Sequence, residues 1–155
     1  MKTYSFETQT KLNKPLREVF PFFANAENLN AVTPPWLKFE ILTPLPIEMK
    51  VGIIVDYQIH LHGIPIRWRS KITEWDPPRK FTDVQIKGPY CFWMHEHFFI
   101  AEGDQTRMID RVEYAVPGWL FAPLIHSLFV KRDLAKIFQY REQRFLEIFC
   151  VGKIS

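Results

Sequence analysis

Two histidines and one aspartate are the side chains of this sequence whose types and spacing best suit chemistry. His95 and His97 stand two residues apart, which on a β-strand places both imidazoles on one face. A tight turn at Gly103-Asp104 would place His97 directly opposite Asp110. A carboxylate beside an imidazole can orient it as a general base. The same three side chains could instead ligate a zinc-like or iron-like ion, or form a hydrogen-bonded polar cluster in an apolar interior.

The polar cluster is favoured over a metal site. Cys91, the nearest cysteine, shares a strand face with His95 but lies two pleats away, so it adds little as a further ligand. We therefore predict no metal and no other cofactor. The sequence has no nucleophile elbow and no glycine-rich phosphate loop. With only 6 glycines, it is not expected to bind a nucleotide.

Arg141 is a further polar residue at an apolar position. It falls in the middle of the apolar stripe of a helix expected over residues 120–149. A guanidinium there must pair with a carboxylate or face an anionic group of a ligand. Asp83 and Asp110 are possible partners. The sequence leaves open whether Asp83 and Gln85 point inward, because the register after Lys87 is not set by a recognisable turn.

The elements that must position these side chains are short and are separated by proline and glycine. Alternation over residues 3–12 predicts a first strand, and two short helices follow before Thr33-Pro34-Pro35 ends them. The apolar spacing then predicts further strands over residues 37–43, 53–62, 66–75, 81–87, 91–102 and 105–116. Beyond Gly118 a spacing of 3.6 residues predicts one long helix. The expected class is α+β, with a curved antiparallel sheet of about seven strands covered by that helix.

Hairpin registers predict which residues face the interior, since directly paired residues share a face. A turn at Gly63-Ile64 pairs Tyr57 with Ser70 and Ile59 with Trp68. Together with the second hairpin and the helix stripe, this predicts the following ligand-contacting residues: Tyr57, Trp68, Trp93, His95, His97, Met108, Asp110, Tyr114, Phe138 and Arg141. His97, His95 and Asp110 are also the candidates for catalysis.

Composition bounds the class of protein. The 155 residues suit one domain spanning residues 1–155, and the 15% of aromatic residues fits either a lined cavity or a Phe-rich core. The net charge of +3 is interspersed, which excludes a nucleic-acid footprint. Two distant cysteines and an N-terminus without an apolar signal core predict a reduced, cytoplasmic location. The most apolar stretch, Val116–Val130, is too short and too interrupted to span a bilayer.

The order of elements resembles the helix-grip fold of the START/SRPBCC superfamily, which includes the birch pollen allergen and polyketide cyclase/dehydrase-like proteins. The sequence is most similar to a bacterial ligand-binding branch of that superfamily. The segments that carry the resemblance are VFPFFANAENLNAVTPPWLKFEILTPLPIEM (19–49), HGIPIRW (62–68), GPYCFWMHEHFF (88–99) and IFQYREQRF (137–145). The resemblance implies a cavity between the sheet and the long helix that takes apolar or aromatic ligands.

Three functions therefore stay open. The first is binding of a small apolar or aromatic molecule, with an acidic group on the ligand if Arg141 is free. The second is a cyclase, dehydrase or lyase that uses His97 or His95 as the base and Asp110 to orient it. The third is an accessory domain of a reductase-like or epimerase-like partner, as the resemblance implies. The apolar segment at 118–121, together with Ile125, is expected to be a pocket entrance, a partner surface or a cap on the open end of the sheet.

Overall fold

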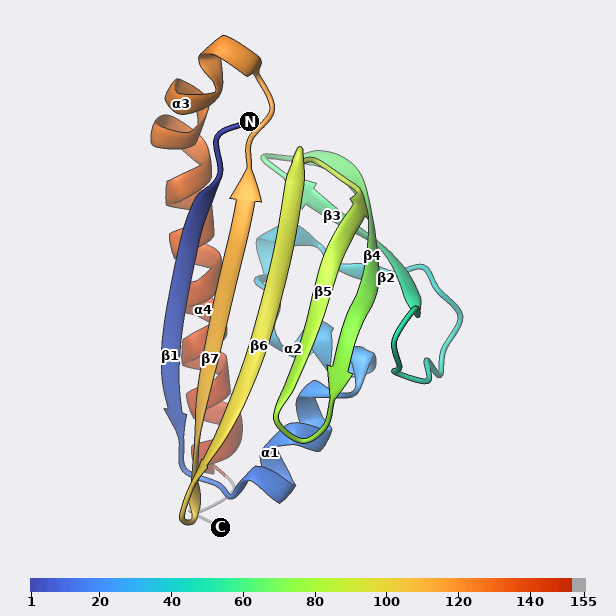
Figure 1. The fold of residues 1–155 in the computed structure, drawn as a ribbon, viewed down its shortest axis with the longest axis vertical. Helices are drawn as coiled ribbons and strands as arrows, with labels where there is room; N and C mark the ends of the chain where they lie inside the picture. Colours follow the sequence, from blue (N-terminus) through green and yellow to red (C-terminus); the bar gives the residue numbers. More distant parts are fainter. Residues whose placement is uncertain (152–155) are drawn as a thin grey trace.

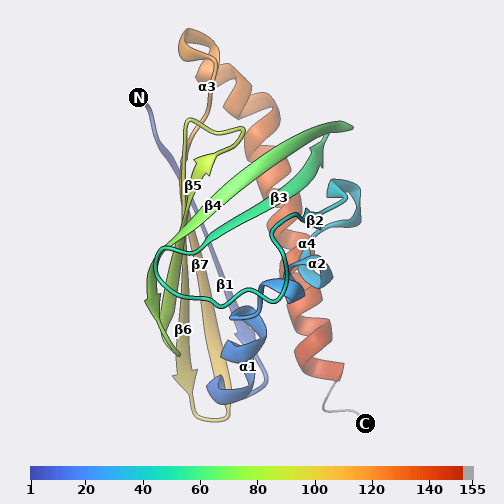
Figure 2. The ribbon, with the colours of Figure 1, turned by 90° about the vertical axis from the view of Figure 1, so that its right-hand side faces the viewer.

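A computed structural model describes residues 1–151 of the chain. Within these residues a single antiparallel sheet curves around a long C-terminal helix, and the helices all lie on its concave face (Figures 1 and 2). The strand order is β1-β7-β6-β5-β4-β3-β2. The strands are β1 (Tyr4–Leu12), β2 (Glu40–Ile41), β3 (Ile54–Leu61), β4 (Ile64–Asp76), β5 (Lys80–Lys87), β6 (Phe92–Glu102) and β7 (Gln105–Ala115). The predicted class and the seven-stranded sheet are thus confirmed.

Short helical elements cross the concave face between β1 and β2. They are α1 (Leu16–Phe23), a 3-10 turn (Ala26–Asn28), α2 (Leu29–Val32) and a second 3-10 turn (Pro35–Leu37). The side chain of Asn25 accepts a hydrogen bond from the backbone N–H of Glu27 at 3.0 Å and so caps the first of these turns. The predicted strand over residues 37–43 is wrong for most of its length. Lys38 takes a left-handed conformation (φ 45°) after the 3-10 turn, so only Glu40–Ile41 pairs with β3.

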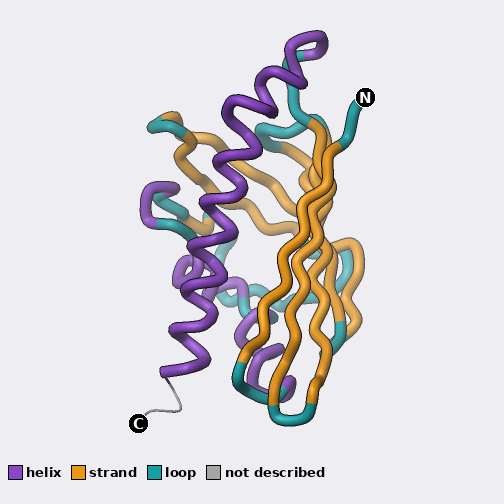
Figure 3. Tube along the Cα trace, turned by 90° about the vertical axis from the view of Figure 1, so that its left-hand side faces the viewer, coloured by secondary structure: helices purple, strands orange, loops and turns teal. Residues whose placement is uncertain are grey.

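The long helix is present but is not one regular α-helix. It begins with a 3-10 turn (Trp119–Phe121) and α3 (Ala122–Ile125), passes through a π-helical turn (His126–Val130) and continues as α4 (Lys131–Val151). The tube in Figure 3 shows this helix running along the full length of the sheet. No helix in the described part of the chain is both long enough and apolar enough to cross a membrane.

The two predicted hairpins have different outcomes. The β6–β7 register is confirmed, with His97 opposite Asp110. The β3–β4 turn instead uses His62 and Gly63, both at positive φ (50° and 80°), as a two-residue turn of this hand requires. Tyr57 therefore pairs with Trp68 and not with Ser70. The slip is of two residues, so every side chain keeps the predicted face.

The concave face holds two clusters of buried side chains. The first, the phenylalanine cluster, lies next to α1 and consists of Leu12, Val19, Phe20, Val32, Phe81, Phe99, Met108, Phe145 and Phe149. The second, the tryptophan–tyrosine cluster, lies at the other end of the sheet and consists of Leu37, Ile59, Trp68, Trp93, Val112, Tyr114, Val116, Leu134 and Phe138.

Candidate functional site

A cavity of about 210 Å³ lies between the concave face and α4. Apolar side chains from several elements form most of its wall, among them Val32 of α2, Val55 and Ile59 of β3, and Leu134 and Phe138 of α4. Each of these is buried. Such a wall favours an apolar molecule, because removing apolar surface from water contributes about 25 cal/mol per Å².

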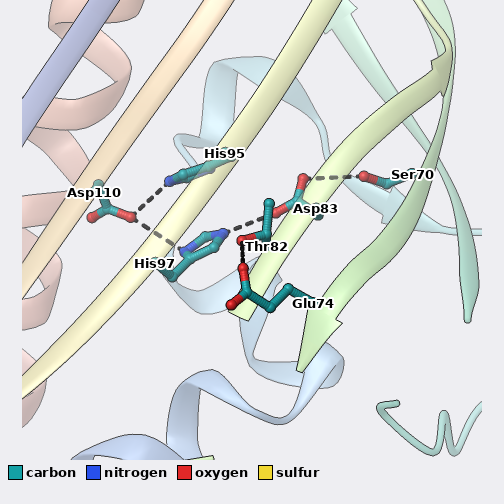
Figure 4. Close-up of polar contacts among 7 residues, drawn as sticks. All are labelled: Ser70, Glu74, Thr82, Asp83, His95, His97 and Asp110. Carbon is teal, nitrogen blue, oxygen red and sulfur yellow. Dashed lines mark hydrogen bonds and ion pairs between the residues drawn. The ribbon is translucent and has the colours of Figure 1, made fainter. Parts of the chain in front are cut away.

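One side of the cavity is polar. Figure 4 shows a chain of side chains that runs across the sheet from β7 to β4. Nε2 of His95 lies 2.7 Å from Oδ1 of Asp110, and Nε2 of His97 lies 2.8 Å from Oδ2 of Asp83. The hydroxyl of Ser70 donates to the other Asp83 oxygen at 3.1 Å. The two imidazoles stack with 3.7 Å between their ring centres.

Strand pairing explains why these side chains meet. Asp83 lies directly opposite His95 in the β5–β6 ladder, and His97 lies directly opposite Asp110 in the β6–β7 ladder. Directly opposite residues share a face of the sheet, so all four point to the concave side. Asp83, whose side the sequence left open, is therefore inward. Gln85 instead bonds the backbone N–H and C=O of Tyr90 and holds the loop between β5 and β6.

The predicted pairing of Asp110 with His97 needs correction. The short hydrogen bond of Asp110 goes to His95, although His97 is its directly opposite neighbour. Nδ1 of His97 lies 3.3 Å from the same oxygen and lacks hydrogen-bond geometry. The orientation of the imidazole rings determines which histidine bonds Asp110. The strand register fixes the face on which a side chain lies but leaves its torsion angles free.

The pKa values of the two histidines are shifted in opposite directions. Burial would lower the pKa of His97, but the hydrogen bond to Asp83 and the close negative charges of Asp110 and Asp83 outweigh it and raise the pKa above its usual value. Burial and the neighbouring charge of His97 lower the pKa of His95, against the hydrogen bond to Asp110. Burial would raise the pKa of Asp83 and Asp110, and the histidine contacts reverse the shift and lower both. Within the network His97 therefore holds a proton more readily than His95 does.

A metal ion could be held by a different set of residues from the one expected. Asp83, His95 and His97 offer ligand atoms that all lie within 4.8 Å of one another. Asp110 would then act behind His95, where a carboxylate orients a metal-bound imidazole. His97 would have to give up its 2.8 Å hydrogen bond to Asp83. Each of the four side chains already has a hydrogen-bond partner within the network without an ion, so the absence of a metal stays our prediction.

Arg141 reaches the cavity from α4. Its guanidinium lies over the rings of Phe138 and Phe145, 5.6 and 5.2 Å from their centres. It forms no ion pair with a carboxylate in the described part of the chain, and its buried Nε has no hydrogen-bond partner. Burial first, and the nearby negative charge of Asp83 second, raise the pKa of Tyr57, while Arg141 lowers it. The Tyr57 hydroxyl thus lies under the influence of both charges.

The structure brings most of the predicted ligand-contacting residues to the cavity. Those that line it are Tyr57, Trp68, Trp93, His95, His97, Phe138 and Arg141. Met108 packs inside the phenylalanine cluster, Asp110 lies behind the histidines, and Tyr114 bonds His126 at 2.7 Å. Prediction missed the lining residues Ser70 and Tyr90. Ser70 was visible as a small residue on the inner face, whereas Tyr90 stands in a loop and carried no signal.

Solved structures match this chain, although no family model and no curated protein does. A norcoclaurine synthase from Thalictrum flavum, solved with dopamine and hydroxybenzaldehyde, matches over 94% of this chain and 88% of its own, with a TM-score of 0.64 and 16% identity. The Zhui aromatase/cyclase from Streptomyces sp. R1128 matches over 97% and 99%, with a TM-score of 0.69 and 15% identity. Ara h 8.0201 matches over 94% and 99%, with a TM-score of 0.63 and 16% identity.

The chain has the helix-grip fold. The resemblance seen in the sequence is thus confirmed for the fold, over nearly the whole length of the chain. The neighbours include ligand-binding and cyclase proteins, so the fold is compatible with both functions. The choice between them depends on the side chains of the cavity.

Proposed function

We propose that this protein binds one small, predominantly aromatic molecule in the cavity between the sheet and α4. The observation that carries the proposal is the 210 Å³ cavity, with its apolar wall and its single polar side. A cavity of about 150 Å³ is enough to bind benzene. The volume therefore suits one substituted aromatic ring.

Unpaired polar atoms support the orientation of such a molecule. Nε1 of Trp68 and Nε of Arg141 are buried without a hydrogen-bond partner, on residues that line the cavity. Both are donors, and a buried donor without a partner costs about 1–3 kcal/mol. A ligand that carries acceptor oxygens would relieve that cost. An acidic group near Arg141 satisfies the strongest of them, because a charged donor forms the stronger hydrogen bond.

The fold neighbours agree with this ligand class. The norcoclaurine synthase structure holds dopamine and hydroxybenzaldehyde, which are one-ring aromatic molecules with polar substituents. At 16% identity that protein is evidence for the fold alone, so its ligands indicate only the kind of molecule that the architecture can enclose. The residues of the present cavity carry the rest of the argument.

Titration with a matched pair of probes tests the proposal. 4-Hydroxybenzoate and p-cresol share a phenol ring and differ in the carboxylate. Binding is read by quenching of tryptophan fluorescence, since Trp68 and Trp93 line the cavity. We expect Arg141→Gln to weaken 4-hydroxybenzoate about tenfold or more, as the loss of a charged hydrogen bond of about 1.5–3 kcal/mol implies, and to leave p-cresol nearly unchanged.

A control variant separates the site from the rest of the surface. Val55→Phe fills the cavity wall and should abolish binding of both probes, while Val51→Phe, on an exposed loop residue, should change neither. Saturable binding that survives Val55→Phe would show that the probes bind elsewhere and would overturn the proposal. Native mass spectrometry of the freshly purified protein would then identify any ligand that it carries from the cell.

Acid–base catalysis is a second candidate, favoured by the opposite titration of the two histidines. His95, which Asp110 orients and whose pKa is lowered, has the form of a general base, and the adjacent His97, whose pKa is raised, has the form of an acid. Its test is deuterium exchange at the α-carbon of an arylacetaldehyde in D2O, followed by NMR. We expect His95→Gln to slow exchange about 100-fold or more while probe binding persists. Equal exchange rates in the two proteins would leave binding as the function.

A further inference from the structure

The turn that leads from β7 into the long helix exposes an unusual amount of apolar surface. We call residues 119–129 the tip. The exposed fractions of its large side chains are 87% for Trp119, 68% for Phe121, 56% for Leu124, 53% for Leu128 and 56% for Phe129. Figures 1 and 3 show the tip projecting beyond the ends of the strands. Single exposed apolar residues are ordinary, but a contiguous set marks an interaction surface.

The tip is a built structure whose inner side is fixed to the sheet. Gly118 (φ 114°) reverses the chain, and Ile125 packs so closely over it that a Cβ there would lie 2.5 Å from Cδ1 of Ile125. His126 stacks on Tyr4 with 3.6 Å between ring centres and lies 2.7 Å from the hydroxyl of Tyr114. These contacts hold one side of the helix against the strands. The opposite side presents residues 121, 124 and 128, which share a helix face by their spacing.

Charged side chains are absent from the tip and begin directly after it. Residues 116–130 contain no Asp, Glu, Lys or Arg. Lys131 and Arg132 follow directly, and Lys2 precedes β1; all three are exposed. The charges of Lys2 and Lys131 both act on His126 of the tip. None of the three forms an ion pair with a carboxylate in the described part of the chain. The neighbouring Asp133 bonds His62 instead. The apolar tip thus has exposed cations close to its base.

We propose that the tip docks on a membrane surface that contains anionic lipid. The aromatic and leucine side chains enter the boundary between headgroups and acyl chains, and the cations at the base of the tip contact the headgroups. An apolar helix face with Trp and Phe, flanked by Lys and Arg, is the pattern of helices that lie on membranes. A second copy of this chain would bring like charges together around its own tip, which opposes pairing. The proposal is independent of what the cavity binds.

Co-sedimentation of the full chain with vesicles tests it. Vesicles of phosphatidylcholine with about 30% phosphatidylglycerol are compared with vesicles of pure phosphatidylcholine. We expect tight binding only to the first, and a loss of about 25-fold on Lys131→Gln with Arg132→Gln, since each cation near an anionic surface contributes about a fivefold factor. We expect a loss of about 100-fold on Phe121→Glu with Leu128→Glu, because two large apolar side chains then stay in water.

A matched variant controls for surface apolarity alone. Val51→Glu with Ile100→Glu changes two exposed apolar residues away from the tip and should leave vesicle binding unchanged. Brominated lipid should quench the tryptophan fluorescence of the wild type. The quenching should be reduced in Trp119→Phe, while vesicle binding persists. Binding that survives Phe121→Glu with Leu128→Glu would overturn the proposal, as would equal binding to both vesicle types. A dimer in solution that these substitutions dissociate, without any vesicle binding, would assign the tip to a second copy instead.

Discussion

The two ends of the concave face are filled by different kinds of side chain. In the phenylalanine cluster the rings pack at contact distance, for example with 5.2 Å between the ring centres of Phe20 and Phe99. Phe145 is only 1% exposed. Phenylalanine has no polar atom, so a phenylalanine cluster can be closed completely without an unpaired donor. Of its nine members only Val32 and Phe81 also line the cavity, so this end of the sheet is mainly a closed core.

The tryptophan–tyrosine cluster is buried to a similar degree but is not closed. Trp68 and Trp93 meet edge to face with 5.3 Å between ring centres, and both line the cavity. Nε1 of Trp68 is left without a partner. Tryptophan and tyrosine supply apolar area and one polar atom each, which suits a wall that must contact a polar substituent. The two ends of the sheet therefore differ in how completely they are closed: the phenylalanine cluster is mainly packed core, and the tryptophan–tyrosine cluster supplies much of the cavity wall. His95 and His97 lie between them, in contact with Phe138 and Phe81 respectively.

Truncation of Phe145 should give the largest loss of stability. Phe145→Ala removes a ring from the closed cluster, and such changes cost about 3–5 kcal/mol because the surroundings collapse only in part. Phe138→Ala, in the cavity wall, should cost less, because one side of that ring already lacks packed neighbours. Chemical denaturation measures both. An equal loss for the two variants would remove the distinction between a closed and an open end.

Enlarging a valine at each end sharpens the comparison further. Val19 lies in the closed cluster at 0% exposure, and Val55 lies in the cavity wall at 5%. Val19→Phe should overpack its surroundings and destabilise the protein by about 1–3 kcal/mol. Val55→Phe can place its ring in the cavity and should leave the free energy of unfolding nearly unchanged. A large destabilisation by Val55→Phe would mean that the cavity cannot accept a ring, and hence not a ligand of that size.

The fold was largely predictable because its signals are local. Alternation gave the strands, and Gly103-Asp104 fixed the β6–β7 register from two residues. The β3–β4 turn was misplaced because a non-glycine residue, His62, occupies the first turn position, and non-glycine residues seldom take positive φ. The π-helical turn at His126–Val130 could not be foreseen, since it coincides with contacts of His126 to Tyr4 and Tyr114, which lie far away in the sequence.

The site was predictable to the point where a single hairpin determines it. That hairpin brought His95, His97 and Asp110 to one face. The inward orientation of Asp83 depends on two register shifts in the β4–β5 ladder, between Arg69 and Ser70 and between Ile72 and Glu74. No turn residue in the sequence predicts these shifts. The exchange of hydrogen-bond partners between the histidines depends on ring orientation. Packing determines this orientation, and the spacing of residues in the sequence does not predict it.

The smallest expected effect is a change in the pH dependence of stability, because it alters a slope and not the packing of either end. The folded pKa of His97 is raised above 6.5 by Asp110 and Asp83, although burial opposes it. A raised pKa contributes stability that is complete below the unfolded value and is lost as the pH rises through the folded value. The wild type should therefore lose stability from about pH 6.5 upward, and His97→Gln should lack that loss.

Urea denaturation at a series of pH values measures both. Phe145→Ala is the control, since its cluster contains no ionisable side chain and it should lower the whole curve without changing its shape. Parallel curves for the wild type and His97→Gln would show that His97 carries no shifted proton, and the two ends would then be separated by an uncharged boundary.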